Sequence, residues 1–286
     1  MAHSATLKAI ILMIASMFAF TLVDSMVKLL SQHMPLGQVL SIFGFGTAIC
    51  FAILAIRQRQ MIFSPLYLHS GLAIRCFGEI LGGSCLVIAL GNTSLSAVTA
   101  LIQFVPLLLT AMAMIVLGER RSMSRILAVL TGFAGTVIII RPTAEAFDFY
   151  LLAGFFAAVG LALRDLSVRL VPPEIPIAGL SLYGALSVGC AGLVMLWIQG
   201  GGIIINSVSA LYAVVMVLVA AAGLWGIAAC LRLADISATS PFRYSRIIFG
   251  IAIGVLVFSE QIDSAVIAGS ALILGAGLYS WYSENR

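Results

Sequence analysis

Residues 237–260 read SATSPFRYSRIIFGIAIGVLVFSE, and this stretch decides the fold of the chain. It is almost wholly apolar and exceeds the roughly 20 residues that a helix needs to cross a bilayer. Yet its first half carries Arg243 and Arg246. A charge near the bilayer centre costs about 2.5–3.5 kcal/mol on insertion scales. We therefore predict that this helix faces the protein interior, where partners, water or a ligand compensate both charges.

The same pattern occurs a second time, 141 residues earlier in the chain. Ser96 aligns with Ser237 and Glu119 aligns with Glu260. The same offset, without a gap, also aligns Leu22 with Leu163, Asp24 with Asp165, Val27 with Val168, Lys28 with Arg169 and Pro35 with Pro176. Because the matches include rare charges and a proline, the chain is predicted to be a duplicated unit. We place the first repeat at residues 1–141 and the second at residues 142–286.

The composition is that of an integral membrane protein. Apolar residues make up 62% of the chain and charged residues 9%, and the mean hydropathy is +1.16. The net charge of +4 is spread over short segments without a dense basic run, so no nucleic-acid partner is expected. The five cysteines lie inside apolar runs with no CxxC or His spacing, which predicts core residues, no metal site and no cofactor.

Apolar runs predict an all-α fold of ten transmembrane helices. They cover residues 7–30, 36–56, 68–91, 95–117, 123–140, 150–171, 176–199, 209–233, 237–258 and 264–283. With the N-terminus inside, nine Lys and Arg residues lie in inner segments, and only Lys28 and Arg141 lie outside. This excess predicts that both termini are cytoplasmic. Each repeat has five spans, an odd number, so the second repeat is inverted, an arrangement typical of alternating-access transporters.

Two charged pairs occupy equivalent places in the repeats. Asp24 and Lys28 lie four residues apart near the outer end of the first helix, and Asp165 and Arg169 lie near the inner end of the sixth. The i to i+4 spacing allows a local ion pair in each helix. Alternatively, each pair exchanges partners across the repeat interface and acts as a gate, and its carboxylate can bind a coupling proton.

Other polar residues inside the predicted helices are candidates for substrate binding. Arg75 and Glu79 repeat the i to i+4 spacing at mid-depth, where an ion pair is costly to desolvate. The paired N–H donors of an arginine guanidinium can bind a carboxylate or another acceptor-rich group, and an aromatic ring can stack on a substrate. The candidate set is Arg75, Glu79, Gln103, Trp225, Arg243, Tyr244 and Arg246. For Trp225, the alternative to stacking on a substrate is an ordinary packing role in the core.

Two further features have structural interpretations. Glu119 and Glu260 end their helices, and we expect each to stabilise the start of the helix that follows it. Pro106 and Pro241 lie inside predicted spans, where they can free backbone carbonyls toward a cavity.

Several of these residues resemble the drug/metabolite transporter superfamily and its EamA-type members. The resemblance covers the duplicated unit, AVTALIQFVP at residues 97–106, LGE at 117–119 and FSE at 258–260, where Ser259 replaces the usual Gly. It implies a basket in which helices 1, 3, 4, 6, 8 and 9 surround a central cavity. FRYSR at 242–246 and VDSMVK at 23–28 are similar to a branch with bacterial riboflavin and S-adenosylmethionine importers.

We therefore expect a secondary active transporter of a small organic metabolite in a bacterial inner membrane. An arginine-rich site argues against a cationic sulfonium and favours riboflavin or another vitamin-like or carboxylate-bearing solute. The alternatives are an exporter of amino acids or drugs, a channel and a membrane enzyme. No catalytic motif such as HExxH or GxSxG is present, so an enzyme is not expected. The expected partners are the substrate, the bilayer and optionally a coupling proton, with the chain as a monomer or weak homodimer.

Overall fold

A computed structural model describes residues 2–118, 123–141, 148–172, 174–204, 206–233 and 240–284. This part of the chain is helical and contains no strand. Ten of its segments are long and apolar enough to cross a membrane, which confirms the predicted all-α fold with ten spans. The boundary between the proposed repeats falls at 141–142, and residues 142–147 lie outside the described part.

The helices follow the predicted ranges to within a few residues. The first five spans are α1 (Ala2–Ser31), α2 (Leu36–Arg57), α3 (Ser70–Asn92), α4 (Leu95–Ile102) with α5 (Val105–Val116), and α6 (Met123–Ile140). A short 3-10 helix, η1 (Pro65–Tyr67), precedes α3. The second five are α7 (Phe149–Leu170), α8 (Ile177–Gln199), α9 (Ser207–Leu233), η2 (Ser240–Tyr244) with α11 (Ser245–Phe258), and α12 (Ser264–Glu284).

The fourth and ninth spans are interrupted, whereas the sequence predicted continuous helices. The fourth breaks at Gln103 and Phe104, whose amides donate to carbonyls only three residues back. In the ninth, the 3-10 helix η2 changes to α11 after Tyr244. These breaks fall at equivalent positions of the two repeats. Pro106, which cannot donate to the Ile102 carbonyl, explains only the first, because its equivalent is an isoleucine. The break therefore belongs to the repeat itself.

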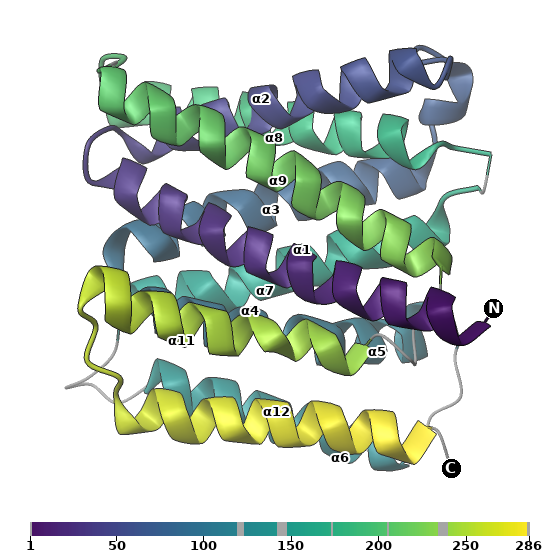
Figure 1. Cartoon of the computed structure of the whole chain (residues 1–286), viewed down its shortest axis with the longest axis vertical. Helices are drawn as coiled ribbons and strands as arrows, with labels where there is room; N and C mark the ends of the chain where they lie inside the picture. The colour runs from purple at the N-terminus through teal and green to yellow at the C-terminus, as the bar shows by residue number, and fades with distance from the viewer. Residues whose placement is uncertain are drawn as a thin grey trace.

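The helix packing has the symmetry that an inverted repeat requires. The most extensive pairs are α2 with α8, α3 with α7, α1 with α9, and α6 with α12. In the two predicted repeats, α2 corresponds to α8 and α6 corresponds to α12, so each of these pairs joins equivalent helices. In the same way α3 corresponds to α9 and α7 corresponds to α1, so the α3–α7 and α9–α1 contacts are equivalent to each other. Equivalent helices such as α2 and α8 run antiparallel (Figure 1). This arrangement is consistent with the predicted inverted repeat.

Small residues set the closest crossings. A Cβ atom on Gly160 of α7 would lie 2.3 Å from the Gly82 amide nitrogen of α3, so only glycine fits there. The equivalent crossing joins Ala19 of α1 to Gly223 of α9, where a Cβ atom on Gly223 would lie 3.2 Å from that of Ala19. Small residues let membrane helices approach closely, and here they do so at equivalent places in both repeats.

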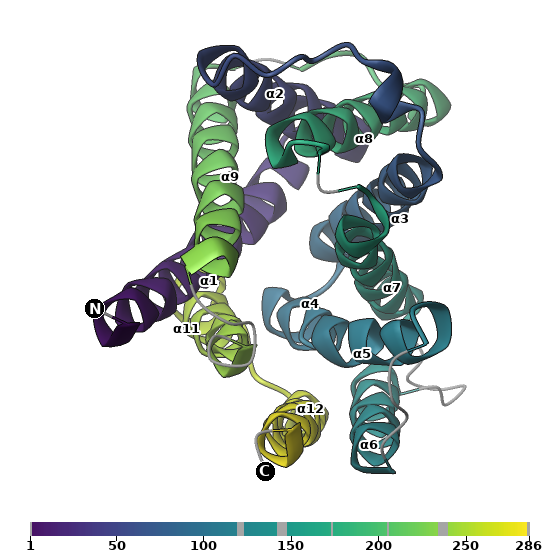
Figure 2. The ribbon, with the colours of Figure 1, turned by 90° about the vertical axis from the view of Figure 1, so that its right-hand side faces the viewer.

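Near the middle of the spans, apolar side chains face outward and charged side chains such as Asp24 and Arg75 face inward. Ile49, Leu218 and Ile248 are 61%, 59% and 68% exposed, whereas Asp24 and Arg75 are only 3% and 6% exposed. This distribution is the one expected for a protein surrounded by lipid. The α6–α12 pair lies at one end of the molecule, and both termini lie on the same face (Figures 1 and 2).

Candidate functional site

A cavity lined by charged side chains lies between the first five spans and the second five. Its volume is about 1020 Å³, including the solvent at its mouth. Residues from α1–α5, α7–α9, η2 and α11 line it, and none of the lining residues comes from α6 or α12. The family resemblance implied walls from the first, third, fourth, sixth, eighth and ninth spans. The second and seventh spans contribute too, through side chains such as Thr47 and Ser181.

The cavity extends toward the face that carries the termini. The N-terminus of α1 lies on this face (Figure 1), and the direction of the spans alternates. Therefore α7 and α9 end there, while α3, α8 and η2 begin there. The cavity is lined by Arg164 and Ile227, near the ends of α7 and α9, and by Ser181 and Arg243, near the starts of α8 and the ninth span.

The opposite end is closed by contacts between the repeats. The Glu260 carboxylate lies 3.2 Å from the Lys28 ammonium. It also accepts hydrogen bonds from the backbone amides of Leu95 and Ser96, at 2.6 and 3.0 Å, and from the Ser96 hydroxyl at 2.8 Å. Lys28 donates in addition to the Thr93 carbonyl oxygen at 2.5 Å. We call this group of Lys28, Glu260 and the first turn of α4 the closure.

The closure corrects the interpretation of Glu260. The sequence suggested that it stabilises the start of the following helix, α12, but its carboxylate instead caps α4 of the other repeat. The first amides of a helix lack intrahelical partners and attract negative charge, so the start of α4 donates strong hydrogen bonds to this carboxylate. Its equivalent, Glu119, lies outside the described residues.

The hydrogen bonds of the closure keep Glu260 ionised. Burial favours the neutral carboxyl, but the amides of Ser96 and Leu95, the Ser96 hydroxyl and the Lys28 ammonium outweigh it. Together they hold the pKa of Glu260 below its ordinary value. The closure therefore carries its full charge at neutral pH.

The charged side chains of the cavity form ion pairs that the sequence only partly predicted. Arg75 and Glu79 pair within α3 at 3.2 Å, as their spacing suggested. Asp24, however, pairs at 2.6 Å with Arg246 of the other repeat, while its expected local partner belongs to the closure. The local-pair interpretation of the first helix is therefore wrong, because the tertiary fold brings an arginine closer.

Asp165 pairs with two arginines, Arg164 and Arg243, that the sequence did not assign to it. Its two carboxylate oxygens lie 2.9 Å from Arg164 and 3.1 Å from Arg243. Arg169 lies in the last turn of the same helix. Besides Glu79, Asp24 and Asp165 each supply a carboxylate to the arginines of the cavity. Arg164 is the residue that the sequence interpretation missed, and its position next to Asp165 was the available signal.

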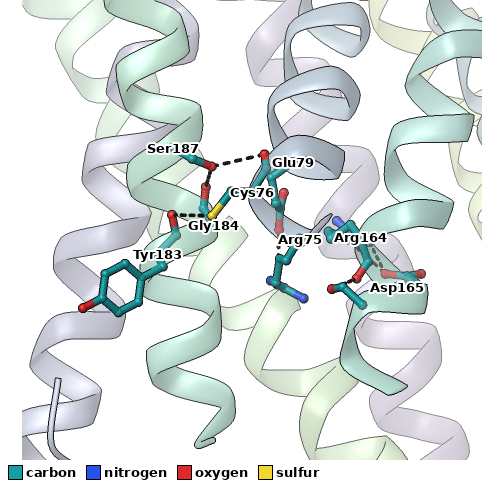
Figure 3. Close-up of polar contacts among 9 residues, drawn as sticks. Arg75, Cys76, Glu79, Arg164, Asp165, Tyr183, Gly184 and Ser187 are labelled. Atoms are coloured by element: carbon teal, nitrogen blue, oxygen red, sulfur yellow. Dashed lines mark hydrogen bonds and ion pairs between the residues drawn. The ribbon is translucent and has the colours of Figure 1, made fainter. Parts of the chain in front are cut away.

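The Arg75–Glu79 pair is held against α8 (Figure 3). A Cβ atom on Gly184 would lie 3.1 Å from the Glu79 Cγ and 3.2 Å from the Arg75 Nε, so α8 leaves just enough room for both side chains. Close by, the Ser187 hydroxyl donates to the carbonyl oxygens of Cys76 and Gly184. This packing fixes the orientation of the pair.

Arg246 is enclosed on several sides. The residue is 8% exposed, and its guanidinium carbon lies 5.5 Å from the centre of the Phe20 ring, within cation–π range. Its Nε atom has no hydrogen-bond partner among the described residues. The arginine thus joins α1 to α11 and faces the cavity with a donor to spare.

Three other predicted site residues have different positions. Gln103 lines the cavity, but its side-chain amide donates to the Arg243 backbone oxygen at 2.8 Å and so ties the two span breaks together. Tyr244 is buried in an apolar cluster, with its hydroxyl against Gly277 of α12, and does not line the cavity. Trp225 is 54% exposed and lines a separate pocket between α2, α8 and α9.

No group of His, Cys, Asp and Glu side chains in the described part of the chain is arranged to hold a metal ion.

Ten helical segments of membrane-spanning length around a charged cavity define a ten-span membrane protein, and their packing is consistent with an internal duplication. Residues 7–141 match the model of the EamA-like transporter family, and this half of the chain is an EamA-like domain. A solved crystal structure has the same fold, with a TM-score of 0.62 and 16% identity over 99% of this chain and 98% of the other.

Curated relatives are more similar in sequence but match a smaller part of the chain. An S-adenosylmethionine uptake transporter of Rickettsia felis is 24% identical over 187 residues, which cover 64% of this chain and 61% of that protein. A riboflavin transporter of Brucella anthropi is 26% identical, over 68% of this chain and 69% of the relative. A riboflavin transporter of Vibrio cholerae serotype O1 is 29% identical, over 61% and 58%. The chain thus matches less than two thirds of the Rickettsia protein.

Proposed function

We propose that the protein is a secondary transporter that carries a small organic metabolite across a membrane by alternating access. The observation that carries this proposal is one charged cavity between two antiparallel repeats, extending to one face and closed at the other by contacts between the repeats. Two repeats that exchange conformations would move the closure from one end of the cavity to the other. The EamA-like match supports this function.

Gating is proposed to depend on charged residues that link the repeats. The closure joins Lys28 to Glu260, and the Asp24–Arg246 pair lies deeper in the cavity. Both pairs must separate if α1 moves away from α11. Asp165 and Arg169 occupy the equivalent positions near the other face, and we propose that they take part in closing it.

The cavity favours a substrate with both charged and apolar parts. Four arginines and two carboxylates line it, and Asp165 adds a third carboxylate behind two of the arginines. The walls between them are apolar and aromatic, with Phe20, Phe43 and Phe51 among them. The sequence argued against a cationic sulfonium because the site is rich in arginine. The carboxylates that lie between these arginines can stabilise a cation, so that argument no longer holds. S-adenosylmethionine is therefore our first candidate and riboflavin our second, in line with the activities named for the relatives.

Vesicles reconstituted with the purified chain test the proposal. Saturable uptake of labelled S-adenosylmethionine or riboflavin, stimulated by the same unlabelled solute on the opposite side, supports a carrier. Measuring uptake with and without a pH gradient separates proton coupling from uniport or exchange. Ionic conductance would identify a channel instead, and chemical conversion of the solute would identify an enzyme.

We further propose that the protein lies in a bacterial inner membrane with both termini in the cytoplasm. In a cysteine-free background, a cysteine at Gln58, which is exposed on the face of the termini, should react only after the cells are opened. A cysteine at Asn92, exposed at the other face, should react in spheroplasts with an impermeant reagent. The reverse pattern would refute this orientation.

A further inference from the structure

We infer that Arg164 and Arg243 together bind an anionic group of the ligand, a carboxylate, at the open end of the cavity. The inference rests on the proposed function only in treating the ligand as the solute that is carried. It concerns a specific subsite and a chemical class of ligand: a carboxylate attached to an apolar or aromatic body.

The first argument is the balance of charge. Arg75 is paired with Glu79, and Arg246 is paired with Asp24, so each of these pairs is neutral. Arg164 and Arg243 instead share the single carboxylate of Asp165. Among the described residues, the ion pairs of the four arginines that line the cavity therefore leave one positive charge without a carboxylate. A charge in a mostly enclosed site requires a counter-charge, which a bound anion supplies.

The second argument is the orientation of the shared carboxylate. Arg164 and Arg243 line the cavity, whereas Asp165 is not among the lining residues. One carboxylate oxygen of Asp165 accepts from Arg164 and the other accepts from Arg243. Asp165 therefore holds the two guanidinium groups next to each other from the side away from the cavity. Each arginine has five N–H donors in a planar fork, and only some of them point at Asp165. One carboxylate cannot accept from all ten of these donors, so a second carboxylate in the cavity can share the two guanidinium groups with Asp165.

The third argument is accessibility. The side chains of Arg164 and Arg243 are 18% and 22% exposed, against 7% for Arg75 and 10% for Arg246. They come from two elements, α7 and η2, that meet near the face with the termini. Arg75 lies beside Arg164 (Figure 3), close enough for their charges to interact, and adds to the positive potential. An entering anion reaches these two arginines before the buried pairs.

The rest of the cavity limits what the anion is attached to. Beyond the two arginines, its walls are formed largely by apolar side chains, among them Phe20, Val23, Phe43 and Leu86. An inorganic anion would satisfy the charge but leave these walls without a partner. A carboxylate attached to an apolar or ring-bearing body satisfies both.

The test compares two ligands that differ in the carboxylate alone. Equilibrium binding of S-adenosylmethionine and of its decarboxylated form is measured on the full-length protein in detergent. The wild type should bind the decarboxylated form about 10- to 100-fold more weakly, since a charge-assisted hydrogen-bonded pair is lost. Arg164→Gln should weaken binding of S-adenosylmethionine by a similar factor and abolish the difference between the two ligands.

The variant is designed to keep the fold intact. Arg164→Gln leaves Asp165 paired with Arg243, and Arg243→Gln leaves it paired with Arg164, so either variant provides the test if the other does not fold. Arg57→Gln is the matched control. It removes the same charge from an exposed position on the same face but outside the cavity, and binding should not change.

Three outcomes would overturn the inference: equal affinity of the wild type for both ligands, an equal loss in Arg57→Gln, or no binding of S-adenosylmethionine. Competition by chloride or sulfate as strong as that by S-adenosylmethionine would also overturn it, because the apolar walls would then play no part. Binding does not require transport. A protein that binds the carboxylate as expected but shows no counterflow would refute the proposed function and leave this inference standing.

Discussion

Asp24 and Asp165 are equivalent residues of the two repeats, yet their surroundings differ. Asp24 pairs with one arginine across the repeat interface, and these side chains are 4% and 10% exposed. Asp165 pairs with two arginines, one on its own helix and one on η2, and these three side chains are 18–22% exposed. The first pair is neutral and more buried, and it links α1 to α11. The second group carries an excess positive charge and is more accessible, which is the difference that the proposed ligand subsite requires.

The largest expected effect comes from breaking the neutral pair. Arg246→Leu leaves the Asp24 carboxylate buried without a partner, which should cost about 3–5 kcal/mol of folding free energy. Arg243→Leu should cost much less, since Asp165 keeps Arg164. Thermal unfolding of both variants in detergent, with the reactivity of the native cysteines as the readout, measures the two losses of stability.

A double variant sharpens this prediction. Asp24→Leu combined with Arg246→Leu removes both charges and should recover most of the stability that Arg246→Leu loses. If Arg246→Leu is as stable as Arg243→Leu, the two aspartates do not differ in the way described above.

An intermediate effect is expected where a pair is crowded by the backbone. Gly184→Ala places a methyl group within about 3.2 Å of the Arg75–Glu79 pair, so these side chains must shift, at a cost of about 1–3 kcal/mol. Gly202→Ala is the control, since an added Cβ there meets nothing within 4 Å. Equal melting temperatures for the two variants would show that the pair can move freely.

The closure should have a smaller effect that depends on pH. Glu260→Gln loses the ion pair with Lys28 and should cost about 1–2 kcal/mol at pH 7. The pKa of Glu260 is lowered in the folded state, so its contribution is complete above the ordinary value near 4.5 and is lost as the pH falls through the lowered pKa. The difference between wild type and variant should therefore persist from pH 7 to pH 5 and shrink below about pH 4. A difference that vanishes already near pH 6 would contradict this assignment.

The smallest effect is expected at the surface. Asp263 pairs with Arg141, and both side chains are 40% or more exposed. The Ala265 amide and Arg141 lower the pKa of Asp263, but water screens an exposed pair of this kind. Asp263→Asn should leave the melting temperature unchanged within error. If Asp263→Asn lowers the melting temperature as much as Glu260→Gln does, the exposure of a carboxylate does not predict how much it contributes to stability.

The amino-acid sequence by itself determined the architecture. Ten apolar runs of bilayer length leave helices as the only way to satisfy the backbone in lipid. The 141-residue offset, with five spans per repeat, predicted the inverted duplication with which the packing is consistent. Arg243 and Arg246 were expected to face the interior because unpaired charges are too costly in lipid, and both line the cavity.

Only the tertiary structure decided which charges meet. Spacing along one helix predicts partners four residues apart, and this was correct for Arg75 and Glu79. It failed for Asp24 and Lys28, whose partners Arg246 and Glu260 lie 222 and 232 residues away along the chain. In a bundle of membrane helices, a buried charge pairs with whichever opposite charge or free helix end the crossing brings nearest. Those crossings are set by the glycines and small side chains at each contact, not by helical periodicity.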